Sequence, residues 1–379
     1  MHMLFLLAIA STSAKSASPD ALGYAFKFAS AIVADPKDMG KAQEAVVWDY
    51  ASAGRFDEAR AAADRVEGWR RGAAYADLAT ALAKTGRRDE AAAMVAKAEA
   101  FRPTVEGWQN PRIGEHIANA YAALGDSEKA EALAKAVAIE DVQQYAGRSS
   151  ATIASGRAAK GDFDGAVQAL DGLSGSTEID DAWWRAAGYL DLARSKSLSP
   201  DRRRKAIASA RTAADAIPGW RKAEALESIA DGFRELGMTA EARESVATAE
   251  SIVAALPETT PIKSPLLSNC ARAWAELGRK DAARALLARA EELGLRAQPI
   301  DRPMLLSNTA SSWAAVGDTR AAKRLYARAL AEAEALVNAR PRALAVVEIC
   351  RSIGKSKLGI DDATRTKLDA LYAGLKDPW

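Results

Sequence analysis

The chain has 379 residues, of which 49% are apolar and only 6% aromatic. Its 52 basic and 50 acidic residues leave a formal net charge of +2, so the charge balance favours neither a nucleic acid nor an anionic membrane as partner. Many apolar but few aromatic residues are typical of thin layers of packed helices, and they argue against one thick globular core.

The N-terminus has the pattern of a short secretory signal peptide over residues 1–14. An apolar run at residues 3–10 is followed by small residues at Thr12 and Ala14, which suits cleavage before Lys15, although no Lys or Arg precedes the run. The run is too short to cross a bilayer, which takes about 20 apolar residues. We expect no transmembrane segment and export to the periplasm or the extracellular space, with a cytoplasmic location as the alternative.

The next segment, residues 15–36, is expected to cap a repeat array. Its apolar and aromatic residues recur at helical spacing and stop before Asp35 and Pro36, where proline disfavours continuation of a helix. We interpret it as a capping helix or as part of a first hairpin. The repeat array that it would cap is expected to fill residues 37–379.

One pattern then recurs to the C-terminus: a glycine, two or three polar residues, and a helix whose first buried position is alanine. Glycine suits the end of a helix because the left-handed backbone conformation favoured there costs glycine least. An alanine stands five residues after each glycine, and a small residue stands seven before it in every copy except one, which has Val47. The seven turn glycines are Gly54, Gly86, Gly125, Gly161, Gly237, Gly278 and Gly317.

The spacing of these glycines indicates stacked helical hairpins. All but one of the successive intervals lie between roughly 32 and 41 residues, and periods of this size are typical of such stacks. The interval from Gly161 to Gly237 is about twice as long as the others, which predicts a degenerate copy near Ser199 and Pro200. The alanines allow the two helices of each hairpin to approach closely.

The order of residues within each unit resembles the tetratricopeptide repeat family. A small residue, a large residue such as Tyr121 or Trp274, the turn glycine and the alanine follow one another in that order from about residue 37 onward. The units exceed that family's usual length of about 34 residues, and they lack its proline at the end of the second helix. The resemblance implies an all-α fold, a right-handed superhelical α-solenoid of about eight or nine antiparallel helix pairs. It also implies a binding scaffold, because this family mostly holds peptides or protein partners.

The two cysteines, Cys270 and Cys350, fall on the buried side of two first helices in this repeat alignment. Helices two hairpins apart should be separated by about 20 Å, given roughly 10 Å per helix. A disulfide requires Cα atoms within about 7 Å. We therefore expect two free, buried thiols, with a disulfide as the alternative.

Tryptophan recurs at the start of first helices. Trp69, Trp108 and Trp220 stand at one and the same distance before a turn glycine, and Trp183 stands at that distance before Pro200. One interpretation is that each ring packs the start of its helix onto the end of the preceding one. The other is an aromatic edge that stacks on sugars, bases or proline-rich peptides. The sequence leaves both interpretations open.

The residue inventory argues against catalysis. His116 is the one histidine beyond the predicted signal peptide, and the sequence contains no HExxH, CxxC, glycine-rich phosphate loop or G-x-S-x-G motif. Pairs of acids such as Asp57 and Glu58 are best explained as first-turn residues that favour the helix dipole. We expect a protein that is not an enzyme and that needs no cofactor and no metal.

The concave side of the stack is the predicted binding surface. Positions six, nine and ten before each turn glycine should face it, and most of them are polar. Amide side chains there could both donate hydrogen bonds to an extended peptide and accept them. The competing interpretation is that these are ordinary solvent-facing residues. The candidate partner-binding residues are Trp48, Glu115, His116, Asn119, Asn269, Arg272 and Asn308.

The sequence thus favours a non-enzymatic scaffold that binds a peptide or protein partner in its concave groove. The alternatives are a glycan-binding module that uses the tryptophans and a helical-repeat RNA binder, although the near-zero net charge speaks against nucleic acid. The family's clamp for an acidic C-terminus cannot be placed here. Glu44, Glu115 and Glu227 stand where basic residues would be needed, so a highly acidic C-terminus is a poor candidate ligand.

Overall fold

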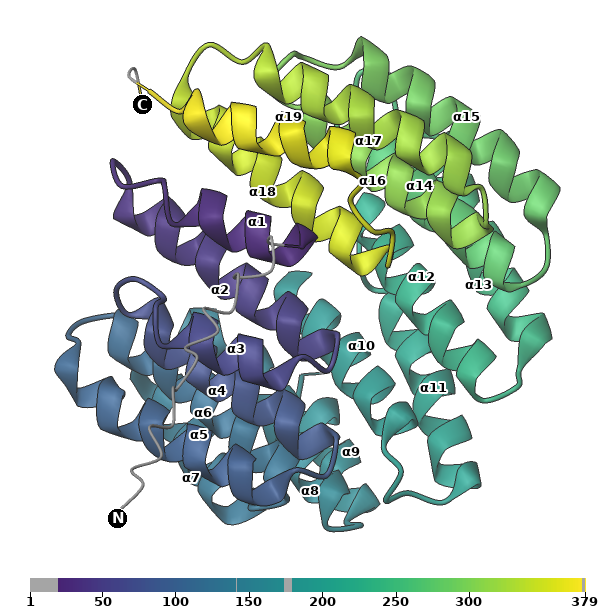
Figure 1. Ribbon diagram of the computed structural model, residues 1–379. Helices are drawn as coiled ribbons and strands as arrows, with labels where there is room; N and C mark the ends of the chain where they lie inside the picture. Colours follow the sequence, from purple (N-terminus) through teal and green to yellow (C-terminus); the bar gives the residue numbers. More distant parts are fainter. Residues whose placement is uncertain (1–19, 141, 174–178, 377–378) are drawn as a thin grey trace, which may run out of the picture.

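The computed structural model describes residues 20–140, 142–173, 179–376 and 379. Its regular secondary structure in these residues consists of α-helices and one short 3-10 helix, with no strand (Figure 1). The predicted signal peptide lies outside these residues. No helix among them is both long enough and apolar enough to cross a membrane. The helices are α1 (Ala21–Ala29), α2 (Pro36–Ser52), α3 (Phe56–Ala63), α4 (Arg70–Lys84), α5 (Arg88–Phe101), η1 (Arg102–Thr104), α6 (Gln109–Leu124), α7 (Ser127–Glu140), α8 (Val142–Ala159), α9 (Phe163–Asp171), α10 (Ile179–Arg194), α11 (Pro200–Ala214), α12 (Trp220–Glu235), α13 (Thr239–Ala254), α14 (Lys263–Glu276), α15 (Lys280–Arg296), α16 (Arg302–Val316), α17 (Thr319–Glu334), α18 (Ala339–Lys355) and α19 (Asp362–Ala373).

The hairpins form where the repeat pattern predicts them. All seven turn glycines have a positive φ, between 73° and 93°, so each adopts the left-handed conformation that ends its first helix. The alanine five residues after each of them is fully buried, as the close approach of paired helices requires. The degenerate copy is the pair α10 and α11, and α11 begins at Pro200 with Ser199 as its N-cap. The stack of antiparallel helix pairs is therefore confirmed.

The first helices of the hairpins pack against one another as an inner row, and the second helices lie outside them (Figure 1). The inner row consists of the even-numbered helices from α2 to α18. After α10 and α18 no glycine stands at the turn position. Counting seven residues on from the buried small residue of each helix, Ala193 and Cys350, places Pro200 and Lys357 at that position. Lys357 also has a positive φ of 54°.

The inner row closes on itself, because α18 packs against α2. The Arg351 Nε of α18 donates to Asp49 Oδ2 of α2 at 2.6 Å, and Lys355 Nζ lies 3.1 Å from the other oxygen of the same carboxylate. Arg340, at the start of α18, forms a 2.6 Å ion pair with Asp38 at the start of α2. The stacked helix pairs of the solenoid therefore form a closed ring, and the repeat pattern had not indicated this closure.

Closure depends on the N-terminal helix α1, which lies in the segment 15–36 that we interpreted as a capping helix or as part of a first hairpin. Helix α1 packs along α18 in the position that a second helix holds in the other hairpins, so the two ends of the chain build one hairpin together (Figure 1). Leu22 of α1 lies over Gly354, and Tyr24 and Phe28 are almost completely buried. An open array would leave these apolar side chains in water.

The last helix, α19, lies in the wedge between the outer helices α17 and α1. Its Leu368 and Leu371 are buried, and its Lys367 forms an ion pair with a glutamate of α17. On the other side, the Tyr24 hydroxyl of α1 donates to Asp369 at 2.9 Å. An amphipathic helix thus fills a gap between two neighbouring outer helices.

Substitution of Gly354 tests the seam between α1 and α18. A Cβ atom at this position would lie 2.7 Å from Leu22 Cδ2 and 2.8 Å from its Cγ. We expect Gly354→Leu to lower the free energy of unfolding by about 1–3 kcal/mol, because the larger side chain overpacks the seam. Urea denaturation followed by circular dichroism measures this change.

The matched control is Gly359→Leu, because no atom lies within 4 Å of a Cβ placed there. It should change the free energy of unfolding by no more than about 0.5 kcal/mol. Adding Leu22→Ala to Gly354→Leu should restore part of the loss, since the smaller residue makes room. Equal stability of the two leucine variants would contradict the seam.

Candidate binding surfaces

The seven candidate residues all lie on helices of the inner row, in a ring of polar side chains. The residues six positions before each turn form one layer around the ring, and the residues nine positions before each turn form a second layer. Each inner helix contributes one residue to each layer, and we call the two layers together the inner face. The layer nine residues before the turn consists of Ala45, Asp77, His116, Thr152, Asp191, Ser228, Asn269, Asn308 and Glu348. The layer six residues before the turn consists of Trp48, Thr80, Asn119, Ser155, Arg194, Asp231, Arg272, Ser311 and Arg351.

His116 links α6 to α4 through a 2.6 Å hydrogen bond between its Nδ1 and Asp77 Oδ1. Burial alone would lower the pKa of His116, but the negative charge of Asp77, together with those of Glu115 and Glu44, favours the charged imidazolium and raises this pKa above its usual value. Burial raises the pKa of Glu44, and Arg70 opposes that shift. His116 is therefore a cross-link between neighbouring hairpins.

Glu115 and Asn119 are also used within the ring. The carboxylate of Glu115 is buried, and it accepts hydrogen bonds from Arg112 of its own helix at 2.8 Å and from Arg148 of α8 at 2.9 Å. The Thr152 hydroxyl of α8 donates to Asn119 Oδ1 at 2.6 Å. Both residues tie α6 to α8, so their polar atoms are largely committed.

Glu227 of α12 organises the opposite part of the row. The Cys270 thiol of α14 donates to Glu227 Oε1 at 3.2 Å, and the Asn269 side chain forms a further hydrogen bond with this carboxyl group. Burial raises the pKa of Glu227 to about 8, so the group is mostly protonated at neutral pH. Cys270 and Cys350 are both buried and free, as the repeat alignment predicted.

The remaining candidates divide between paired and exposed residues. Arg272 lies 3.6 Å from Asp231 of the neighbouring α12 and 3.4 Å from Glu276 of its own helix. Trp48 is 44% exposed, and Asn308 is also exposed. Five of the seven candidates therefore form cross-links between or within inner helices, and Trp48 and Asn308 are the two candidates whose side chains are exposed.

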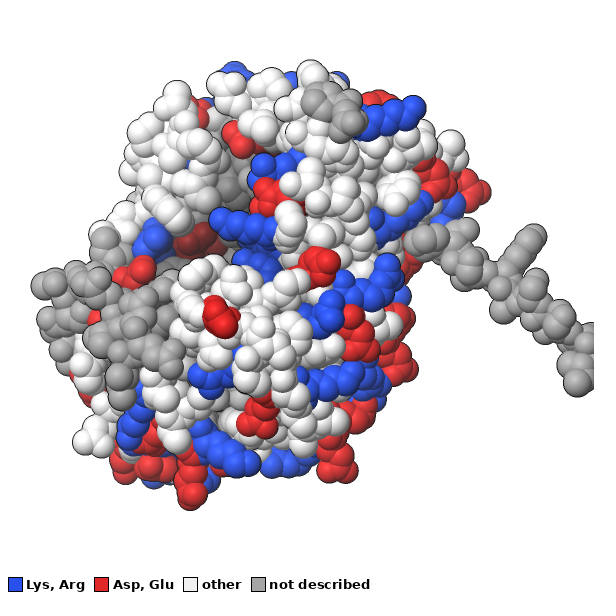
Figure 2. All heavy atoms as spheres, turned by 90° about the vertical axis from the view of Figure 1, so that its left-hand side faces the viewer, with Lys and Arg blue, Asp and Glu red and all other residues white. Residues whose placement is uncertain are grey.

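Charges also approach one another across the ring. Asp191 of α10 is exposed, yet the surrounding protein raises its pKa, and the positive charge of Lys84 on α4 opposes that shift. Helices α6 and α8 separate α4 from α10 along the row, so Lys84 and Asp191 face each other over the interior. Figure 2 shows a hollow on one side of the molecule with both acidic and basic side chains around it.

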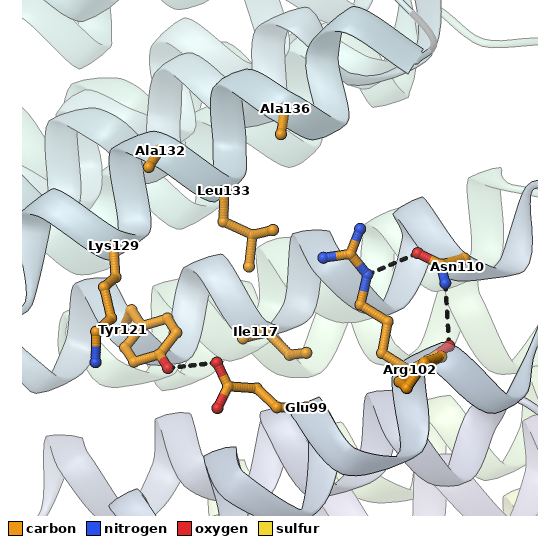
Figure 3. Close-up of a pocket in the computed structure, with 10 residues that line it drawn as sticks. Glu99, Arg102, Asn110, Ile117, Tyr121, Lys129, Ala132, Leu133 and Ala136 are labelled. Carbon is orange, nitrogen blue, oxygen red and sulfur yellow. Dashed lines mark hydrogen bonds between the residues drawn. The ribbon is translucent and has the colours of Figure 1, made fainter.

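A cavity of about 650 Å³ lies outside this interior, between the outer helices α5 and α7 and above α6 (Figure 3). The Tyr121 hydroxyl donates to Glu99 at 2.5 Å, and Arg102 Nε donates to Asn110 Oδ1 at 2.7 Å, so its polar walls are internally satisfied. We call it the α5–α7 groove. It is lined by Glu99, Arg102, Pro103, Asn110, Ile117, Tyr121, Lys129, Ala132, Leu133 and Ala136.

This groove was not predicted from the sequence, because binding positions were sought only on the inner helices. The available signal was on α7, where Ala132, Leu133 and Ala136 extend the apolar surface of the helix beyond the buried Ala134 and Val137. A helix with so wide an apolar surface has more than one neighbour to contact.

The tryptophans do not form a single edge. Trp69 and Trp108 stand at the N-caps of α4 and α6, and their rings meet edge to face at 5.3 Å. Trp69 is half-buried, which fits the packing interpretation, whereas Trp108 is 63% exposed. A separate cavity of about 400 Å³, the tryptophan pocket, is lined by Arg148, Asp180, Trp183, Trp184, Trp220, Arg221 and Glu224.

No group of three or more His, Cys, Asp or Glu side chains in the described part of the chain is arranged to hold a metal ion. No protein-family model and no curated protein matches the sequence.

Several solved helical-repeat structures are similar to parts of the chain. The kinesin light chain TPR-like repeats of Podosopora anserina share 18% identity at a TM-score of 0.32, over 60% of this chain and 96% of that one. NprR from B. thuringiensis in complex with its cognate peptide NprX has 11% sequence identity and a TM-score of 0.30, over 79% of this chain and 88% of that one. The human IFIT1 dimer with m7Gppp-AAAA has 15% sequence identity and a TM-score of 0.29, over 82% of this chain and 72% of that one. These likenesses are remote. The geometry of the hairpins themselves makes the fold a TPR-like helical repeat.

Glu227→Gln tests the buried carboxyl group. A glutamate ionises near pH 4.5 in the unfolded chain, but Glu227 ionises near pH 8 in the folded protein. Between these values the unfolded state binds fewer protons, so the pKa shift makes the wild-type protein less stable as pH rises. Glutamine does not titrate, so we expect the variant to gain stability relative to wild type from about pH 5 to about pH 8.

Urea denaturation at both pH values measures this difference. The matched control is Glu128→Gln, because the Glu128 side chain is 91% exposed. Its stability relative to wild type should not depend on pH in this range. A pH-independent difference for Glu227→Gln as well would mean that Glu227 ionises like a surface carboxylate.

Proposed function

We propose that this protein is an interaction scaffold that binds an amphipathic helix of a partner protein in the α5–α7 groove. The observation that carries the proposal lies elsewhere on the ring, where α19 fills the wedge between α17 and α1. The chain itself therefore supplies an example of the kind of segment that such a gap accepts.

The α5–α7 groove and the wedge filled by α19 are lined by residues at the same repeat positions. Glu99 of the groove and Leu330 beside α19 both stand thirteen residues after their turn glycines. Tyr121 of the groove and Ile353 beside α19 both stand four residues before the turn. The α5–α7 groove is thus the same wedge in another repeat, and no helix of the described chain lies in it.

The chemistry of the groove suits the apolar face of a helix. Ile117 and Leu133 form an apolar floor, and Ala132 and Ala136 leave space above it (Figure 3). Leucines spaced like Leu368 and Leu371 of α19 lie on one face of a helix, which is how grooves of this kind recognise helical partners. The Lys129 amine at the mouth is exposed and lies 3.4 Å from Asp126, and a partner with an acidic residue beside its apolar stripe would add a second ion pair there.

The inner face is the second candidate surface, as the sequence suggested. Its exposed Trp48 and Asn308 could hold an extended peptide, with Glu115, His116, Asn119, Asn269 and Arg272 as the surrounding cross-links. We rank it below the groove because those cross-links already use most of its polar atoms. The proposed role is non-enzymatic, and the predicted signal peptide supports a site of action outside the cytoplasm.

A phage-displayed library of short amphipathic helices, panned against the full chain, tests the groove. Helices selected from it should bind at least tenfold more weakly to Ala132→Glu, which places a charge on the apolar wall. The matched control is Ala285→Glu, because Ala285 is the repeat-equivalent exposed alanine of α15, outside the groove. It should bind them like wild type.

Two outcomes would overturn the groove. One is a library that yields no helix whose binding differs between Ala132→Glu and Ala285→Glu. The other is binding that is lost in the double variant Trp48→Ala and Asn308→Ala but kept in Ala132→Glu, which would assign the partner to the inner face.

A further inference from the structure

The tryptophan pocket is formed by the N-terminal parts of three successive inner helices. Trp183 and Trp184 come from α10, Trp220 is the first residue of α12, and Arg148 comes from α8. All three indoles are half-buried around one cavity of about 400 Å³. This volume lies within the range of small-molecule sites, and neither the groove nor the inner face includes any of these tryptophans.

The charges around the pocket balance. The guanidinium of Arg148 lies 4.7 Å from the Trp184 ring centre, and that of Arg221 lies 5.8 Å from the Trp220 ring centre. Arg221 also donates to Asp180 Oδ1 at 2.8 Å. With Glu224, the lining carries two basic and two acidic groups, so it offers hydrogen-bond donors and acceptors without net attraction for either charge.

Glu224 is the lining group with acceptor capacity to spare. Burial raises the pKa of its carboxyl group, and the nearby charge of Arg221 opposes that shift. It has no hydrogen-bond partner in the part of the chain that the structure describes. A half-buried carboxylate without a partner loses solvation, and a ligand hydroxyl that donates to it would restore a hydrogen bond.

We propose that the tryptophan pocket binds a neutral sugar unit. A sugar ring has an apolar C–H face, which suits the flat face of the Trp183 indole, and hydroxyl groups at its edge, which both donate and accept. Glu224 can accept from a hydroxyl, and the guanidinium of Arg221 can donate to another. The site is independent of the proposed helix-binding groove.

The structure favours a sugar over the other ligand class that aromatic pockets hold, a quaternary ammonium ion. Such a cation binds over indole faces. Here the guanidinium groups of Arg148 and Arg221 already lie against the rings of Trp184 and Trp220, so they occupy indole faces that such a cation would need. A neutral sugar needs only one free indole face together with hydrogen-bond donors and acceptors at its edge.

An array of immobilised neutral, sialylated and sulfated oligosaccharides, together with a choline surface, tests the proposal on the full chain. We expect binding to at least one neutral oligosaccharide, and at least tenfold weaker binding by Glu224→Gln, which keeps the shape of the side chain. Trp183→Ala should weaken binding by at least as much. Trp108→Ala, which removes an exposed indole outside the pocket, should bind like wild type.

A loss of sugar binding by Glu224→Gln would not be explained by misfolding, because this substitution leaves the packing of the indoles intact. Absence of any neutral-sugar binding would overturn the proposal. Binding that survives both Glu224→Gln and Trp183→Ala, or binding to choline or to acidic glycans in place of neutral ones, would overturn it as well.

Discussion

The contact between α1 and α18 is the constraint on which the rest of the structure depends. It buries the aromatic and apolar face of α1 and brings Arg351 and Lys355 of α18 to the buried carboxylate of Asp49 on α2. Closure also encloses the inner face, where water no longer solvates every charged group fully. The raised pKa of Asp191 on the inner face fits that enclosure, because the surrounding protein reduces the solvation of its carboxylate.

The same closure explains where surfaces for partners remain. Inner helices pack on their inner neighbours, whereas the outer helices of successive hairpins do not pack closely on one another among the described helices. Wedges therefore open toward the outside. Helix α19 fills one of them through Leu368 and Leu371, and the α5–α7 groove is the corresponding wedge between two other repeats. A closed ring thus moves the accessible apolar surface from the concave side, where such scaffolds usually bind, to the outer side.

The local part of this architecture could be predicted from the sequence because its signals are local. A left-handed turn requires glycine, and a close helix pair requires alanine, so the hairpins, the degenerate copy before Pro200 and the two free thiols followed from spacing alone. Closure left no such signal, because the contact of Leu22 with Gly354 joins residues from opposite ends of the chain. The pairing of Asn269 with Glu227 was missed for a related reason: position within a repeat says which side of a helix a residue occupies, but not which neighbour it meets.

The most direct test of ring closure is a distance measurement between the two ends of the array. Pulsed electron paramagnetic resonance can measure the distance between spin labels on cysteines introduced at Lys37 and Asn338. Both positions are exposed and lie beside the ion pair of Asp38 with Arg340. The native thiols are buried and should not take up label in the folded protein. A closed ring predicts one short, narrow distance distribution. A long or broad distribution would show an open superhelix and contradict ring closure.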